Sequence, residues 1–503
     1  MPAIILLLFA AALTSCTEHK QLEAELAGFD VEITVEGTGG DGTPAKPFDI
    51  PSGELTVHYT ARAFDTRGMD LPFSGQVRID AVPGEIVPQD PATADFSEGL
   101  LSGTLQVRKV FGRFALWVED VRLEPSDVVR GATSMQLVRR TGSFATGVSN
   151  TVYFKKPTLA EIQYAPWLEA EANIDTSALP NEFVDIDCRA GDTAGPFAAD
   201  GHGQLVVTGI FNEGFFVTDV AGGSDFDHLY VYTYSYPDEL EIGDRLDRLV
   251  GSSQDFSGCT QISFPSWRRA TDDKLDPEPF RVKDLDSLIP PVLVTTAMCS
   301  EGSTSNLHLC GHSKNNWTME RLESARVRLE NLRTPDVYVD CDFNGDSEVV
   351  PDWLDSSNPE AICSVNCLKH DGSASFYVQT VKGSEQALAD VVEQDAVVCP
   401  WESDIPGIAP RCKIVRVGPE HICSELTTLR QFGQWVAALD DGAGPLINLL
   451  TGESWVNFDP TAEQNLGRNI EFVQGNLRHV RAARPRWVVL VGRLPGDVPE
   501  WMK

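Results

Sequence analysis

The sequence predicts a mainly β protein: a sandwich, followed by one or two small barrels that carry long disulfide-linked insertions. Apolar and polar residues alternate over short runs, which is the period of a half-buried strand. Clusters of Gly, Pro and Asp separate these runs and indicate tight turns. The chain has 503 residues, enough for about three domains that each bury a core of their own.

Composition excludes some classes of protein. The chain has 74 acidic and 40 basic residues and a formal net charge of −34, so its surface repels a polyanion, and a general nucleic-acid coat protein is disfavoured. Hydrophobic residues make up 42% and charged residues 23%, as in an ordinary globular protein and unlike a disordered chain. We therefore expect the bulk of the chain to be folded.

The N-terminus predicts export. Residues 4–13 form an apolar run of signal-peptide length, too short to span a bilayer, and lead into Leu13-Thr14-Ser15-Cys16. These four residues resemble the lipobox of bacterial lipoproteins. The resemblance implies that residues 1–15 are removed and that Cys16 carries the lipid. With Thr17 next, it implies sorting to the outer membrane of a Gram-negative cell, facing the periplasm or the exterior; a plain secreted protein is the alternative.

Cysteine usage is consistent with an oxidising compartment. Beyond Cys16 the chain has an even number of cysteines, so up to five disulfides are expected. The candidates are Cys188, Cys259, Cys299, Cys310, Cys341, Cys363, Cys367, Cys399, Cys412 and Cys423. Short spacings favour the local pairs Cys299 with Cys310, Cys363 with Cys367, and Cys399 with Cys412, although each cysteine could equally reach a more distant partner.

After a tether at 16–28, residues 29–155 read as a β-sandwich. Short alternating runs such as 31–35 and 114–118 recur between turn signals, among them Pro83-Gly84. The stretch from 73 to 120 resembles the bacterial immunoglobulin-like domains of cell-surface proteins. That resemblance implies an immunoglobulin-like sandwich that acts as a spacer or an adhesive module.

A proline-containing linker is expected at 156–198, and a small barrel at 199–300. Runs such as 204–209, 214–219 and 240–246 combine strand patterns with glycines that allow a barrel to bend. Residues 201–264 resemble the OB-fold modules that accompany bacterial extracellular nucleases. The alternative is that the glycines only build the fold.

Aromatic residues of this barrel are candidates for ligand binding. Phe215, Tyr230 and Tyr232, with Phe216 and Tyr234, would form a stacking platform for bases or sugars if they were exposed. Strand alternation places about half of them in the core, where they would only pack.

Residues 301–503 are expected to form a second OB-like domain with insertions. The run 325–332 reads as its opening strand, and 376–379 echoes the earlier Phe215-Phe216-Val217-Thr218. Strand patterns at 470–478 and 487–491 close the domain.

A calcium site is the most specific local pattern. Asp340, Asp342, Asn344 and Asp346 place oxygen ligands on alternate residues, with glycine at the sixth position, as in the first half of an EF-hand loop. The twelfth position is Pro351 instead of the bidentate glutamate. A structural calcium ion and a metal-free acidic turn both remain open.

We find no catalytic motif, so no catalytic residue is predicted, and whether the protein is an enzyme stays open. Arginines gather near the C-terminus, where they would grip an acidic group or neutralise neighbouring carboxylates; they are Arg468, Arg478, Arg481, Arg484, Arg486 and Arg493.

The sequence favours an outer-membrane lipoprotein that binds or scaffolds without catalysis. Its expected partners are the membrane, through the lipid, and an envelope protein or glycan, while the net charge disfavours nucleic acid. The alternatives are a component of extracellular nucleic-acid processing, and capture of single strands or glycans by the OB-like barrel.

Overall fold

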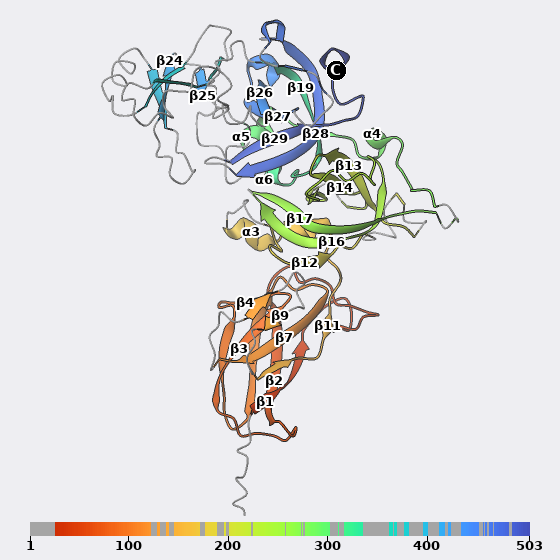
Figure 1. Ribbon diagram of the computed structural model, residues 1–503, viewed down its shortest axis with the longest axis vertical. Coiled ribbons are helices and arrows are strands. Elements are labelled where there is room, and N and C mark those ends of the chain that lie inside the picture. Colours follow the sequence, from red (N-terminus) through yellow and green to blue (C-terminus); the bar gives the residue numbers. More distant parts are fainter. Residues whose placement is uncertain are drawn as a thin grey trace, which may run out of the picture. The chain divides into compact units, whose positions relative to one another are not determined.

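The structure is a computed structural model (Figure 1). It describes the chain in these ranges: 26–121, 128–130, 137–139, 145–171, 177–188, 196–197, 201–222, 225–256, 258–272, 274, 277–301, 310, 316–334, 362–365, 367–369, 377–381, 396–400, 412–417, 421–423, 434–451, 456, 458–459, 462–465, 467–481 and 485–503. Strands account for 49% and helices for 10%, which confirms the mainly β prediction. Among the described residues, no helix is long and apolar enough to cross a membrane.

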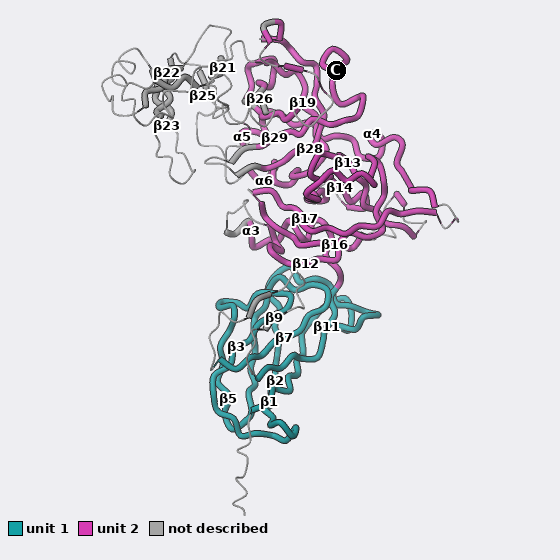
Figure 2. Tube along the Cα trace, in the orientation of Figure 1, with its two compact units in different colours: residues 1–131, 135–154 teal, residues 132–134, 155–503 magenta. Residues whose placement is uncertain are grey.

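Two compact units divide the chain (Figure 2). Unit 1 comprises 1–131 and 135–154, and unit 2 comprises 132–134 and 155–503. The strands of unit 1 are β1 (Leu26–Val35), β2 (Leu55–Asp65), β3 (Gly75–Val82), β4 (Glu85–Val87), β5 (Ala92–Phe96), β6 (Leu100–Arg108), β7 (Arg113–Asp120), β8 (Val128–Arg130), β9 (Leu137–Arg139), β10 (Thr146–Val148) and β11 (Val152–Tyr153).

Nine strands of unit 1 form one sheet in the order β4-β6-β2-β1-β10-β7-β3-β5, with β11 on β7, and β8 and β9 form a separate antiparallel pair. All pairings within the nine-stranded sheet are antiparallel except β1 with β10. Along β2 every second residue is buried, from Leu55 to Asp65, so the alternation seen in the sequence does place one face on the core. Strand β1 begins at Leu26, inside the segment expected to be a tether.

Unit 2 starts with the segment predicted as a linker. It contains α2 (Leu159–Gln163), α3 (Pro166–Glu171) and β12 (Phe183–Asp185). A capping box between Thr158 and Glu161 begins α2, whose Leu159 and Ile162 are fully buried. Strand β12 pairs with β16 (Arg245–Phe256). The segment is part of the folded unit because it contributes apolar side chains and a strand.

The first barrel of unit 2 is closed by five strands: β13 (Leu205–Phe211), β14 (Gly214–Asp219), β15 (His228–Tyr232), β16 (Arg245–Phe256) and β17 (Cys259–Arg269). The first three form an antiparallel meander, and β15 pairs in parallel with β17. The β16–β17 hairpin then pairs back onto β13 and closes the sheet. Every residue of β13 and β14 is buried, so these strands are covered on both faces.

A second barrel repeats this topology with β19 (Arg326–Arg333), β26 (Gln434–Ala438), β27 (Leu446–Leu450), β28 (Asn469–Arg481) and β29 (Pro485–Val491). Again the third strand pairs in parallel with the fifth, and the fourth pairs with both the fifth and the first. Strand β18 (Val292–Leu293) extends its edge. The runs at 325–332, 470–478 and 487–491 were thus predicted correctly as strands of this domain.

Residues 377–379 of the echo lie in neither barrel. Tyr377 begins β22 (Tyr377–Val381), which belongs to a separate four-stranded sheet inserted between β19 and β26. Its strand order is β20 (Ile362–Val365), β22, β24 (Cys412–Val417), β23 (Ala396–Pro400). The other inserted strands are β21 (Cys367–Lys369) and β25 (His421–Cys423).

Short helices complete unit 2: α4 (Leu285–Leu288), α5 (Thr296–Ser300), α6 (Trp317–Glu320), η2 (Asp440–Gly442), η3 (Glu463–Asn465) and η4 (Glu500–Met502). The predicted disulfide between Cys299 and Cys310 is present and joins α5 to the segment before α6.

The two barrels pack directly on each other within unit 2. Phe211, Phe216 and Tyr230 of the first barrel share one buried apolar cluster with Val488 and Leu490 of the second. This contact explains why the outer faces of β13 and β14 are buried, since the second barrel covers them.

A glycine permits this approach. Gly209 lies at a bulge in β13, and a Cβ there would lie 2.2 Å from Oδ1 of Asn476 on β28. The Asn476 amide is held in place because its Nδ2 donates to Oγ1 of Thr208 (3.3 Å) and to the carbonyl of Ser324 (3.2 Å). Only a residue without a side chain fits at 209.

We expect Gly209→Ala to destabilise the protein by about 1–3 kcal/mol, because the added methyl group must displace a hydrogen-bonded amide. Urea unfolding of wild type, of Gly209→Ala, of Asn476→Ala and of the double variant gives a thermodynamic cycle. In the double variant the clash is absent, so its cost should be smaller than the sum of the single costs. Additive costs would show that the contact at 209 is not limiting.

Candidate functional site

The structure places the three residues predicted to bind a ligand in different environments. Phe215 is fully buried and packs on Trp267, with 5.3 Å between ring centroids. Tyr230 is 3% exposed, and the Arg478 guanidinium lies 5.0 Å from its ring centroid. Tyr232 is partly buried. Alternation along β14 places Phe215 on the other face of the sheet from Tyr230. The second barrel covers Tyr230, and of the three only Tyr232 reaches the surface.

An exposed aromatic cluster continues from Tyr232. Its ring centroid lies 4.4 Å from that of Tyr234, which in turn lies 5.2 Å from that of Phe264. Tyr234 is 51% and Phe264 66% exposed, so the cluster faces solvent. We call Tyr232, Tyr234 and Phe264 the aromatic rim.

The backbone holds two rim residues in an unfavourable conformation. Tyr234 has φ +62° and Phe264 has φ +50°, a region that bulky L-residues rarely adopt. Strain of this kind persists where the surrounding structure imposes it and is concentrated at functional sites. Here it presents two large rings to water, where a glycine would fit the backbone better.

Polar groups lie beside the Tyr232 end of the rim. The β13–β14 turn contributes Asn212 and Glu213, and the carbonyl of Glu213 accepts a hydrogen bond from the backbone N–H of Thr233 (2.8 Å). Arg493 donates to Oδ1 of Asn212 (3.1 Å) and lies 5.4 Å from the ring centroid of Tyr236. Burial, and the charge of Glu213, raise the pKa of Tyr232. The rim therefore combines stacking surfaces with hydrogen-bonding groups at its edge.

Phe264 was not identified from the sequence. The signal for it is the proline that follows, because Pro265 interrupts a strand pattern and a proline inside a strand marks a bulge. The register does shift here, between the pairs Val250–Ser266 and Ser252–Ser263.

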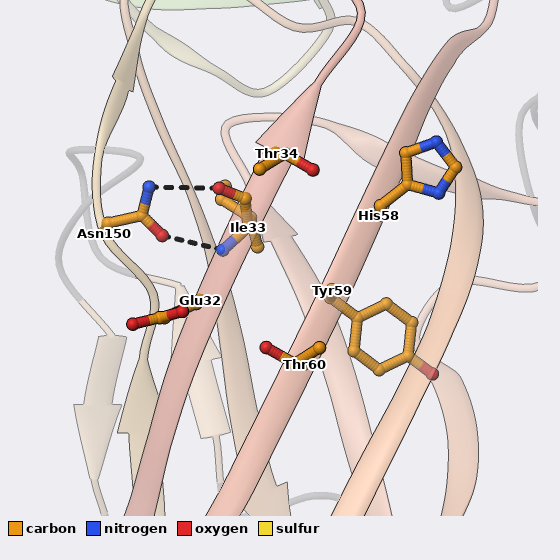
Figure 3. Close-up of a pocket in the computed structure, with 7 residues that line it drawn as sticks. All are labelled: Glu32, Ile33, Thr34, His58, Tyr59, Thr60 and Asn150. Carbon is orange, nitrogen blue, oxygen red and sulfur yellow. Dashed lines mark hydrogen bonds between the residues drawn. The ribbon is translucent and has the colours of Figure 1, made fainter.

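A pocket lies on unit 1 (Figure 3). It measures about 530 Å³ and is lined by β1, β2 and Asn150. The Asn150 amide accepts from the Ile33 N–H (2.7 Å) and donates to the Ile33 carbonyl (3.1 Å). Asn150 thus completes the hydrogen bonding of β1 as a neighbouring strand would, which is a structural role.

A buried ionisable cluster lies where the barrels meet. Oε2 of Glu323 accepts from the Thr260 N–H at 3.0 Å, and the Cys259 thiol and the Arg478 guanidinium lie beside it. Burial raises the pKa of Glu323 to about 8, while the Thr260 hydrogen bond and Arg478 act in the opposite direction. Burial likewise raises the pKa of the Cys259 thiol well above its usual value. A fully buried, protonated thiol is a poor nucleophile.

Two of the disulfide candidates are not in disulfides. Cys188 and Cys259 are free thiols, 3% and 0% exposed, and burial raises the pKa of Cys188 to about 12. The expectation of up to five disulfides therefore does not hold for these two candidates, both of which are buried. For Cys367 the backbone register gives Cys423 as the opposite residue. Cys341 lies outside the described residues, and the remaining pairings involve side chains that are not described.

The lipidation and calcium predictions fall outside the described residues. These are Cys16, and the loop formed by Asp340, Asp342, Asn344 and Asp346. Within the ranges given above, no group of three or more His, Cys, Asp or Glu residues is arranged to hold a metal ion.

The C-terminal arginines do not form one patch where they are described. Arg468 stacks on Trp501 at 3.4 Å, Arg478 lies 5.0 Å from the ring centroid of Tyr230, and Arg493 donates a hydrogen bond to Asn212. The side chains of Arg481, Arg484 and Arg486 are not described.

No protein-family model matches the chain, and no curated protein matches its sequence. What the chain binds has to be inferred from its own residues.

We expect Phe264→Gly to be more stable than Phe264→Ala by about 1 kcal/mol, because only glycine adopts this backbone without a steric cost. Chemical unfolding of both variants measures the difference. Ser266, exposed on the same strand with ordinary φ, is the control: there the alanine variant should be the more stable. The same order at both positions would contradict strain at 264.

Glu323 should make stability depend on pH. Because its folded pKa is raised above the unfolded value, its contribution is complete below the unfolded pKa and is lost as pH rises towards about 8. We expect Glu323→Gln to flatten the fall of the unfolding free energy over this range, as measured by urea unfolding at several pH values. Glu278→Gln, at an exposed carboxylate, should leave the slope unchanged. Parallel curves for wild type and Glu323→Gln would refute the assignment.

Proposed function

We propose that this protein is a non-catalytic binding module of the bacterial cell envelope, anchored by a lipid on Cys16, that captures glycan chains on the aromatic rim. The observation that carries the proposal is the pair of exposed rings, Tyr234 and Phe264, held in left-handed backbone. Strain and exposure both cost stability, so an unliganded role in packing does not account for them.

We assign both barrels to the OB fold. In support, each has five strands with the first three in a meander, the third parallel to the fifth, and the fourth pairing with the first. OB-folds bind ligands on strands 2–3 and on the adjoining loops. In the first barrel those strands are β14 and β15, and the rim begins at the end of β15 beside the β13–β14 turn.

A glycan fits the rim better than a nucleic acid does. Aromatic faces stack on either ligand, and the polar groups of Asn212, Glu213 and Arg493 suit hydroxyl groups. A nucleic acid brings a phosphate on every residue to a chain with a net charge of −34. Repulsion by the acidic chain therefore opposes the binding of a nucleic acid and does not oppose the binding of a neutral glycan.

Unit 1 would serve as an immunoglobulin-like spacer between the lipid and the barrels. Its antiparallel strands, with one parallel pairing between β1 and β10, and a single buried core are consistent with such a sandwich. The signal segment and the lipobox support export and anchoring, although they lie outside the described residues.

The test uses the chain from Thr17 onward, titrated against neutral polysaccharides and against single-stranded DNA. Replacing both Tyr234 and Phe264 by glycine should weaken glycan binding about tenfold or more while the fold is retained, because the backbone strain is relieved as the rings are lost. Phe256→Ser removes an exposed ring outside the rim and should leave binding unchanged.

Two results would contradict the proposal. If the protein bound DNA through the rim and bound no polysaccharide, the ligand of the rim would be a nucleic acid and not a glycan. Glycan binding that survives the double substitution would show that the rim is not the site. Alanine at Tyr230 is unsuitable for this test, since that ring is part of the contact between the barrels.

A further inference from the structure

A cavity of about 550 Å³ opens on the first barrel. None of the residues that line it belongs to the aromatic rim. It is bounded by the segment before β13, the β15–β16 loop, the start of β16 and the end of β17. The lining residues are His202, Glu239, Asp247, Trp267, Arg268, Arg269 and Thr271. The volume lies within the range of small-molecule sites, roughly 300–1,000 Å³.

One wall of the cavity is fixed in position. Oδ2 of Asp247 lies 3.2 Å from Nδ1 of His202, and Oδ1 of Asp247 accepts a hydrogen bond from the Gly203 N–H at 2.7 Å. On its other side the His202 ring lies 4.8 Å from the ring centroid of Phe280. The imidazole is therefore oriented before any ligand arrives, which reduces the entropy lost on binding.

Arginine side chains gather at the cavity. Arg268 on β17 lies directly across from Arg248 on β16, and both are exposed. Like charges at such a position destabilise a sheet. Among the described residues neither arginine has an ion-pair partner, although the chain has 74 acidic residues.

Arg269 adds to this charge. Its guanidinium lies 3.8 Å from Oδ2 of the buried Asp244, whose Oδ1 already accepts from Nε of Arg281 at 2.7 Å. Asp244 is thus committed mainly to Arg281. The cavity has two arginines on its wall and a third opposite one of them, on a protein that is otherwise strongly acidic.

We propose that this cavity binds an acidic sugar residue, with its ring on Trp267 and its carboxylate or sulfate on Arg268 and Arg269. Guanidinium groups bind such anions in a bidentate manner. The carboxylates of Asp247 and Glu239 accept hydrogen bonds from sugar hydroxyls, which a simple inorganic anion does not offer. The site shares only its saccharide class of ligand with the proposed function, and it is tested by different variants.

The experiment is calorimetric titration of the chain from Thr17 onward with trigalacturonate, with a chondroitin sulfate disaccharide, and with neutral maltotriose. We expect binding of an acidic probe and not of maltotriose; the two acidic probes distinguish a carboxylate ligand from a sulfate ligand. Arg268→Ala should weaken binding about tenfold or more. The affinity of Arg268→Lys should lie between those of wild type and Arg268→Ala, because lysine keeps the positive charge but lacks the guanidinium group that binds an anion in a bidentate manner.

Stability provides an independent readout. Because Arg268→Ala removes half of a like-charge pair, its unfolding midpoint should rise while its affinity falls. Arg321→Ala, which removes the same charge elsewhere on unit 2, should leave affinity unchanged, and so should the rim substitution Phe264→Gly. Equal binding by Arg268→Ala and wild type, equal binding of maltotriose, or no saturable binding of either acidic probe would each overturn the assignment. Loss of rim binding with the cavity intact would instead count only against the function proposed for the rim.

Discussion

The packing of one barrel against the other is the contact on which the rest of unit 2 depends. It requires Gly209, because any larger residue there meets the Asn476 amide, and it buries Phe216 and Tyr230 under the second barrel. With β14 covered in this way, the first barrel has little free surface along its second strand. The end of β15 and the bulge in β17 stay exposed, and the aromatic rim lies there.

The rim is the outer end of a continuous row of rings. The ring centroids of Phe216 and Tyr230 lie 4.7 Å apart, and those of Tyr230 and Tyr232 lie 6.5 Å apart. From Tyr232 the row continues through the other two rings of the rim. The inner rings are fixed in a close-packed interior, so the outer ones inherit a defined position. The same row therefore contributes to cohesion at one end and to recognition at the other, and burial alone distinguishes the two roles.

The sequence was sufficient for those features that depend on local pattern. Strand periodicity located β2, β19 and β28, and close spacing identified the disulfide of Cys299. It was not sufficient where the outcome depends on partners far along the chain. Nothing near Tyr230 indicates that β29 will cover it, and nothing near Cys259 indicates that Glu323 and Arg478 will enclose its thiol. The strain at Phe264 and the opposition of Arg248 to Arg268 appear only once the register of the β16–β17 hairpin is known.

The insertion between β19 and β26 has a consequence for how the two barrels reach their final state. In the first barrel only residues 212–213 connect the first two strands, whereas in the second barrel residues 334–433 do so. Closing so long a loop costs more chain entropy, and topologies rich in distant contacts form slowly. During synthesis the first barrel is also completed earlier. It should therefore be closed when β28 emerges, and its outer face around Gly209 can act as a template on which the slower barrel assembles.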